Sequence, residues 1–142
     1  MKKIGWGILG AARVNERLMP AIVQSDLGEL IAIGSRRAGA SRECLLKHLP
    51  RYEDKVSCFD GFDQVINHKK VDVIYIPLAN EEHTEVALKA LRAKKHVLIE
   101  KPMAIKSEEV KILIKEATKN NVKIMEGFMY AFHPQFDRII SI

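Results

Sequence analysis

The amino-acid sequence predicts an α/β fold, a doubly wound parallel sheet of the Rossmann type. Short apolar runs alternate along the chain with longer segments in which apolar residues recur at helical spacing. Strands that alternate with helices of this size form βαβ units, and those crossovers make the sheet parallel. Small and polar residues follow the apolar runs directly, at the edge of the sheet where such folds bind ligands.

Six apolar runs are the expected strands. The run VDVIYI is the strongest of them because β-branched residues favour extended backbone. Each run is followed by a glycine, a proline or an acidic residue. In chain order the expected strands are Ile4–Leu9, Leu30–Ile33, Val56–Phe59, Val71–Ile76, His96–Ile99 and Val122–Met125.

The segments between these runs are the expected helices. Apolar residues between Thr84 and Leu91 keep the i, i+3, i+4, i+7 spacing of one helix face. Ser107 is the expected N-cap of a later helix, because two glutamates follow it in the first turn. The other expected helices cover Arg13–Gln24, the residues between Gly39 and Pro50, and a short turn at Phe62–Ile66.

Composition indicates one globular domain with an ordinary core. Of the 142 residues, 47% are hydrophobic and 29% are charged. No apolar run approaches the ~20 residues of a membrane span. The net charge of +5 is spread along the chain and does not form a basic stripe interleaved with aromatic residues. We therefore expect neither a nucleic-acid partner nor a membrane partner.

Two cysteines, Cys44 and Cys58, lie in apolar surroundings without the spacing of metal ligands. The chain enters a strand pattern at once, with no signal-peptide core and cleavage site. These features predict free thiols, no metal site and a cytoplasmic location.

The opening stretch contains a literal G-x-G-x-x-G at Gly5, Gly7 and Gly10. A phosphate-binding fingerprint works only where a strand has ended and a helix begins. Here Ile4–Leu9 is the strand, so Gly5 and Gly7 lie inside it and the turn begins at Gly10. The predicted pyrophosphate loop therefore consists of Gly10, Ala11, Ala12, Arg13 and Val14.

This loop departs from the fingerprint in its last small position. Asn15 stands where a small residue is expected, which predicts a looser contact between the first helix and its strand. The alternative reading is an ordinary strand-to-helix turn without a ligand.

Ser35, Arg36 and Arg37 follow the second strand, where a dinucleotide fold contacts the ribose of adenosine. An NAD site offers a carboxylate here, and none lies between Ile33 and Gly39. A hydroxyl and two guanidinium groups suit a 2′-phosphate bound by charge-assisted hydrogen bonds. The sequence favours NADP and leaves NAD possible; a solvated basic turn is the alternative.

Two further groups follow the fourth and fifth strands. After the fourth come Leu78, Asn80 and His83, where Asn80 could cap a helix and His83 could face a cofactor or solvent. After the fifth comes Glu100-Lys101-Pro102, in which a lysine held by the glutamate could orient a reacting hydroxyl. The alternative for that trio is an exposed salt bridge.

Aromatic residues follow the sixth strand in the segment EGFMYAFHPQ. They could plug the core, and His133 could cap a helix that Pro134 begins.

Together these residues resemble the Gfo/Idh/MocA family, named for glucose-fructose oxidoreductase, inositol dehydrogenase and rhizopine catabolism. The signatures are WGILGAAR, Pro77 with Asn80 and His83, Glu100-Lys101-Pro102, and Met129-Tyr130 with His133-Pro134. The resemblance spans essentially the whole chain. It implies a nicotinamide-dependent oxidoreductase acting on a sugar, polyol, dihydrodiol or similar hydroxyl–carbonyl pair.

The resemblance also implies roles for individual residues. Lys101 is the catalytic group, touching substrate and nicotinamide ribose, usually with a cis peptide before the proline. Ala131 departs from the family, since many relatives place an arginine there, near the substrate. The implied cofactor-binding set is Gly10, Ala11, Ala12, Arg13, Val14, Ser35, Arg36, Arg37, Leu78, Asn80, His83, Glu100 and Lys101.

Family members carry a second, substrate-binding domain, which is absent from this chain. We expect residues 1–126 to form the dinucleotide domain and residues 127–142 to lead toward the missing domain. The expected function is the NADP(H)-binding half of an oxidoreductase that transfers a hydride between the nicotinamide and a small-molecule substrate. We expect the fragment alone to be inactive and the parent to be a homo-oligomer through the missing domain. The alternative is a non-catalytic module that binds or senses NADP(H).

Overall fold

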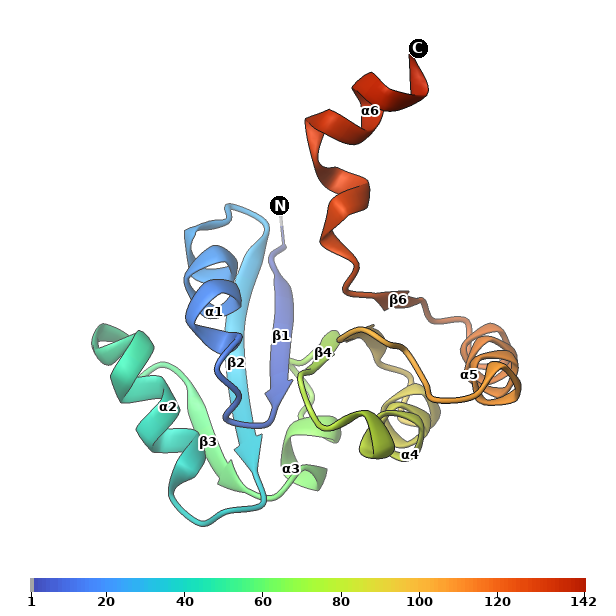
Figure 1. Cartoon of the computed structure of the whole chain (residues 1–142). Helices are drawn as coiled ribbons and strands as arrows, with labels where there is room; N and C mark the ends of the chain where they lie inside the picture. Colours follow the sequence, from blue (N-terminus) through green and yellow to red (C-terminus); the bar gives the residue numbers. More distant parts are fainter. Residues whose placement is uncertain (1) are drawn as a thin grey trace.

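A computed structural model describes residues 2–142 and contains a six-stranded, all-parallel sheet with helices on both faces (Figure 1). The order of the strands is β3-β2-β1-β4-β5-β6, with β1 in the middle of the sheet. This is the doubly wound Rossmann arrangement, so the predicted fold class is confirmed. The strands are β1 (Ile4–Leu9), β2 (Gly28–Ser35), β3 (Ser57–Asp60), β4 (Val73–Ile76), β5 (His96–Ile99) and β6 (Ile124–Glu126).

Helices follow the strands as the apolar periodicity predicts. Two single-turn 3₁₀ helices, η1 (Pro50–Tyr52) and η2 (Met129–Phe132), join them. The α-helices are α1 (Asn15–Gln24), α2 (Ala40–His48), α3 (Asp63–Ile66), α4 (Asn80–Arg92), α5 (Ser107–Lys119) and α6 (Pro134–Ile140).

Two helix N-termini differ from expectation, and a third agrees with it. Ser107 is not the N-cap of α5, because Lys106 takes that place and Glu109 accepts a hydrogen bond from the Lys106 amide at 3.0 Å. The expected first helix begins at Asn15 and not at Arg13. His133 does cap α6, since its Nδ1 accepts from the Gln135 amide at 3.2 Å.

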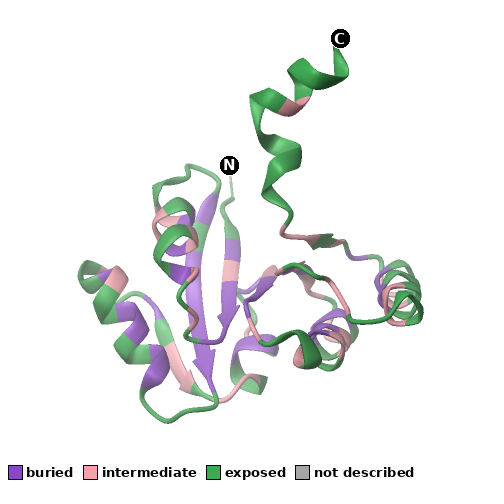
Figure 2. Cartoon of the chain, viewed as in Figure 1, coloured by how far each residue is buried: buried purple, intermediate pink, exposed green. Residues whose placement is uncertain are grey.

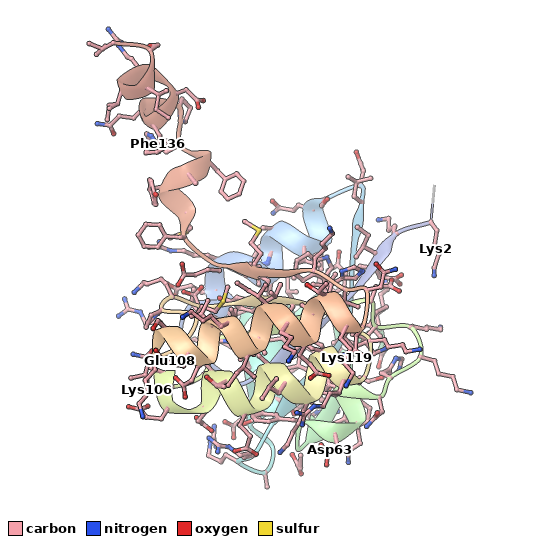
Figure 3. All side chains as sticks on the ribbon, turned by 90° about the vertical axis from the view of Figure 1, so that its right-hand side faces the viewer. Lys2, Asp63, Lys106, Glu108, Lys119 and Phe136 are labelled. Carbon is pink, nitrogen blue, oxygen red and sulfur yellow. The ribbon has the colours of Figure 1, made fainter. Side chains whose placement is uncertain are left out.

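Each face of the sheet has its own core, because neighbouring side chains of a strand point to opposite faces. On one face, Ile8 and Tyr75 pack with residues of α1 and α2, and on the other, Leu9 and Ile74 pack with α3, α4 and α5. Figure 2 shows the buried residues concentrated on the central strands. Figure 3 shows α4 and α5 side by side over one face, with Glu108 and Lys119 of α5 on its outer side.

Gly5 and Gly7 lie within β1, as expected, and they are required there by packing. A Cβ on Gly5 would lie 1.9 Å from the Lys70 carbonyl oxygen, and one on Gly7 would lie 2.7 Å from Val65 Cγ1. The Gly5 amide also donates a hydrogen bond to Asp72 Oδ2 at 2.9 Å. These glycines therefore let α3 and the entry to β4 approach the central strand closely.

The last residues form an arm that projects from the sheet (Figures 1 and 2). Neither η2 nor α6 contains a buried residue, and Met129, Phe132 and Ile140 are each about 70% exposed. Phe128 and Phe136 stack edge-on against Tyr130, with ring centroids 4.5 Å and 4.9 Å away. Phe128, Tyr130 and Phe136 therefore pack on one another, Phe132 is exposed, and none of these aromatic residues plugs the core.

Candidate functional site

The carboxyl ends of β1, β2 and β4 surround a cavity of about 420 Å³. This is where the strand order reverses, since β1 pairs with β2 on one side and with β4 on the other. Ligands of doubly wound sheets bind at such a point. The lining residues come from four separate segments of the chain: Gly10, Ala11, Ala12, Ser35, Arg36, Arg37, Phe62, Pro77, Leu78 and Ala79.

The turn after β1 offers a row of amide donors. Within residues 2–142, the backbone N–H groups of residues 11–14 donate to no protein acceptor. They lie at the N-terminus of α1, whose N-cap Val14 supplies no side-chain hydrogen bond. Unpaired amides at a helix N-terminus favour an anion, because they combine free donors with the positive end of the helix dipole.

Gly10 makes this turn possible in two ways. Its φ of +117° is a conformation that side chains rarely adopt, and a Cβ would lie 2.8 Å from Leu78 Cδ2. Its amide donates to the Gly34 carbonyl at 2.7 Å, which fixes the turn to the end of β2.

Asn15 does not loosen the contact between helix and strand, contrary to expectation. Its side chain is fully buried, and Nδ2 donates to the Gly10 carbonyl at 2.8 Å and to Cys44 Sγ at 3.4 Å. The amide therefore fastens α1 to the turn of residues 10–14 and to α2, where a glycine would only have allowed close approach.

The basic turn after β2 is already paired with carboxylates. Arg36 forms an ion pair with Glu82 of α4 and lies over the Phe62 ring, 5.6 Å from its centroid. Arg37 pairs with Glu43 of α2 at 2.5 Å, which lowers the pKa of that carboxyl. Sequence reasoning missed both acids because it searched only between Ile33 and Gly39. Helices that follow parallel strands begin at the same edge of the sheet, so the glutamates in the first turns of α2 and α4 could have been expected near the two arginines.

The turn after β5 is held by side chains, though not as expected. Glu100 Oε1 accepts a hydrogen bond from the Tyr75 hydroxyl at 2.7 Å, and Oε2 lies 3.4 Å from the Lys101 amide. No ion pair joins Glu100 to the Lys101 ammonium within residues 2–142, so the structure shows neither the salt bridge given as the alternative nor a lysine side chain held by Glu100. Lys101 is exposed, and the peptide before Pro102 is cis, as the resemblance implies.

A second cavity, of about 560 Å³, adjoins the turn of residues 10–14. Arg13 and Val14 of that turn line it, as do Gly127 and Met129 after β6. Apolar atoms of Tyr75 and Leu98 line the sheet side, and Glu100 supplies a carboxylate. The turn of residues 10–14 contributes to both cavities, since residues 10–12 line the first and residues 13–14 the second.

Asn80 and His83 differ from expectation. Asn80 is the first residue of α4 and is exposed, but Ala79 is the N-cap. His83 is fully buried: its Nδ1 lies 2.8 Å from the Pro102 carbonyl oxygen and its Nε2 lies 3.1 Å from that of Leu78. Both ring nitrogens therefore contact backbone, and the expectation that His83 contacts a cofactor is corrected.

Ionisation of the Tyr75 hydroxyl is expected to lower the free energy of unfolding at alkaline pH. Burial and the Glu100 carboxylate raise the pKa of Tyr75 well above its ordinary 10.0. Its neutral form thus stabilises the fold below pH 10, and we expect that contribution to disappear as pH rises above this value. Urea unfolding at roughly pH 8 and roughly pH 11 measures the loss. Tyr75→Phe should lower the free energy of unfolding at pH 8 by about 1.5 kcal/mol. Between the two pH values, the free energy of unfolding of this variant should fall less than that of the wild type. An equal loss in both proteins would contradict the assignment.

The described part of the chain contains neither a candidate metal site nor a candidate membrane-spanning helix. Among residues 2–142, no group of three His, Cys, Asp or Glu side chains could hold a metal ion. None of the helices in that range combines the length and hydropathy needed to cross a membrane. Both cysteines are free thiols, and Cys44 is buried.

A helix N-terminus with free amides at the switch point of a doubly wound sheet defines a dinucleotide-binding domain of the Rossmann class. Residues 4–128 match the family described as "Oxidoreductase family, NAD-binding Rossmann fold", Gfo/Idh/MocA. The chain belongs to this family.

Similar proteins cover the whole chain but are much longer. An uncharacterised oxidoreductase of Rhizobium meliloti is 32% identical over 100% of this chain and 41% of its own. A dTDP-3,4-didehydro-2,6-dideoxy-alpha-D-glucose 3-reductase of Actinomadura kijaniata is 31% identical over 96% of this chain and 40% of its own. A crystal structure of KijD10, a 3-ketoreductase from the same organism in complex with NADP and TDP-benzene, superposes with a TM-score of 0.88. It is 30% identical and covers 97% of this chain and 41% of that chain. This chain thus spans about two fifths of the relatives it matches.

Proposed function

We propose that this chain is the NADP(H)-binding half of an oxidoreductase acting on a sugar, polyol or dihydrodiol-type hydroxyl or carbonyl. The observation that supports it most is the row of amides at residues 11–14, which have no protein acceptor within residues 2–142 and follow a glycine with a φ of +117°. Calorimetric titration of the chain with NADP⁺ tests the binding step. A chain without measurable affinity for either nicotinamide dinucleotide would contradict the proposal.

The residues fit a dinucleotide in extended form. The amides of residues 11–14 would hold the pyrophosphate, and the cavity beside Ser35 and Phe62 would hold the adenosine. From the same turn, the second cavity leads toward Glu100, next to Lys101, where the nicotinamide end would lie. When bound, the nicotinamide supplies hydride acceptance or donation.

NADP(H) is proposed over NAD(H) because two guanidinium groups follow β2. A 2′-phosphate near Arg36 and Arg37 would take charge-assisted hydrogen bonds that a 2′-hydroxyl cannot match. Glu82 acts against this preference, because it is paired with Arg36 and would repel the phosphate. The two arginines therefore favour the phosphorylated cofactor while the carboxylate limits the difference.

Substitutions on the two sides of this ion pair should shift cofactor preference in opposite directions. Arg36→Ala removes a charged donor and should narrow the ratio of NAD⁺ to NADP⁺ dissociation constants by about tenfold. Glu82→Gln frees Arg36 and should widen the same ratio several-fold, on the order of 1 kcal/mol. Calorimetric titration of both variants with both nucleotides measures the ratios. A wild-type chain that binds NAD⁺ as tightly as NADP⁺ would contradict the preference.

Lys101 is the proposed catalytic residue. It is exposed, it is the second residue after β5 and it is not neutralised by Glu100, so its ammonium is available to a substrate oxygen. An ammonium at that oxygen would orient the hydroxyl and stabilise the developing alkoxide, while the hydroxyl proton would pass to a base supplied by the proposed second domain; in the reverse direction the ammonium would polarise the carbonyl.

The remaining features of the whole protein are proposals that rest on the longer relatives. We propose residues 1–126 as the dinucleotide domain and residues 127–142 as the connection to a second domain. That domain would cover the exposed apolar arm, exclude water from the nicotinamide and mediate homo-oligomerisation. Free thiols favour a cytoplasmic location.

A further inference from the structure

His83 connects the ends of two strands that flank the proposed nicotinamide position. It projects from the first turns of α4 and has no exposed surface. Its Nδ1 contacts the Pro102 carbonyl after β5 at 2.8 Å, and its Nε2 contacts the Leu78 carbonyl after β4 at 3.1 Å. One side chain thus ties both turns to one helix.

The two contacts are not equivalent, because both partners are acceptors. A neutral imidazole carries one N–H and donates to only one of two carbonyls, whereas the imidazolium donates to both. The shorter contact, to Pro102, is the better site for the single N–H of the neutral ring. The hydrogen bond to the turn after β5 is therefore the one formed in either protonation state.

Every neighbour of Lys101 in this turn is anchored by a side chain from another element. Glu100 accepts from the Tyr75 hydroxyl at 2.7 Å, and the Met103 amide donates to Glu126 Oε1 at 2.7 Å. Pro102 has no amide hydrogen, so its carbonyl is the group through which it can be held, and His83 holds it. Lys101 is the exposed residue in the middle of this anchored turn.

We infer that His83 is a positioning residue that fixes the backbone carrying Lys101 through its Nδ1 contact with Pro102. The inference rests on the proposed function of Lys101. A reacting group displaced by about 1 Å can lose roughly 10²-fold in rate, so a turn released on one side is expected to act on turnover. The other contact of His83 is with Leu78, which lines the cavity proposed for the adenosine, so a variant that keeps this contact should bind the cofactor with nearly unchanged affinity.

Two substitutions separate the contacts of His83. The amide nitrogen of asparagine is as many bonds from Cα as Nδ1, and that of glutamine as many as Nε2. His83→Asn can therefore keep the bond to Pro102, and His83→Gln can keep the bond to Leu78. Each variant keeps one donor in the same buried site, so they are matched in burial and in the number of hydrogen bonds.

Steady-state kinetics of the full-length protein distinguish positioning from general structural support. We expect His83→Gln to lower kcat by ~10-fold or more, with the cofactor dissociation constant within about twofold, and His83→Asn to retain kcat within about threefold. In a Lys101→Ala background the difference between the two variants should vanish, because both act through Lys101. Equal losses in the two variants, or a difference that persists without Lys101, would overturn the inference.

A measurement without turnover keeps this inference separate from the proposed function. In the 142-residue chain, the Met103 amide hydrogen should exchange ~10-fold faster in His83→Gln than in His83→Asn, since only the former releases Pro102. Equal exchange rates would overturn the positioning role. An inactive wild-type full-length protein would contradict the proposed function instead, while the exchange rates still decide whether His83 holds the turn.

Discussion

Lys101→Ala in the full-length protein is expected to lower kcat by ~10²–10⁴-fold, the usual share of general acid–base catalysis. Hydride transfer from a carbinol leaves positive charge on the carbon unless the hydroxyl proton departs. A lysine beside that oxygen stabilises the transition state more than the bound substrate, so kcat and kcat/KM should fall together. Steady-state rates with the true substrate measure the effect.

The absence of an ion pair with Glu100 sharpens this prediction. A lysine neutralised by a neighbouring carboxylate would serve the turn, whereas Lys101 is exposed and Glu100 accepts from Tyr75 instead. Cofactor affinity should change much less than kcat. Lys111→Ala, on the exposed side of α5, is the matched control and should leave kcat unchanged. A Lys101→Ala protein with the wild-type kcat would make Lys101 a residue of the turn only.

Gly5→Ala is expected to lower the free energy of unfolding by about 3 kcal/mol or more, the upper range for overpacking. Its Cβ would lie 1.9 Å from the Lys70 carbonyl oxygen. That segment cannot retreat easily, because the Asp72 amide donates to the Gly5 carbonyl at 2.8 Å and the Asp72 carboxylate accepts from the Gly5 amide. The difference in urea midpoints between variant and wild type measures the loss.

Gly39→Ala is the matched control for this substitution. Gly39 has a φ of +75°, but no atom lies within 4 Å of the place that a Cβ would occupy. Only the conformational cost of about 1–2 kcal/mol therefore applies. Folded Gly5→Ala should bind NADP⁺ with unchanged affinity, because Gly5 lies inside the strand. A weakened affinity without a loss of stability would place Gly5 in the phosphate loop after all.

The alternation of strands and helices could be read from the sequence, because burial on a parallel sheet imposes continuous apolar runs and helices show the 3.6-residue period. The position of the turn at Gly10 followed from the same reasoning, since a strand had to end before a helix could begin. These properties depend on residues that are neighbours in the sequence.

Contacts between distant segments could not be read in this way. Glu82 forms an ion pair with Arg36 from another βα unit. Asn15 stands where a small residue was expected, and its buried side chain hydrogen-bonds to the Gly10 carbonyl there. The location of His83 depends on how α4 meets the turn after β5. In each case the local pattern is compatible with several partners, and packing selects one of them.

The central place of β1 has a consequence for synthesis of the chain. Of the six strands β1 is synthesised first, and it can pair with β2 once residues 28–35 have emerged. Its other partner, β4, comes only at residues 73–76. Until then β1 is an edge strand of the nascent protein, with unpaired backbone groups and apolar side chains that another chain could join. A translational pause between β3 and β4 would therefore prolong the stage most prone to aggregation, whereas a pause after β4 would find that edge closed.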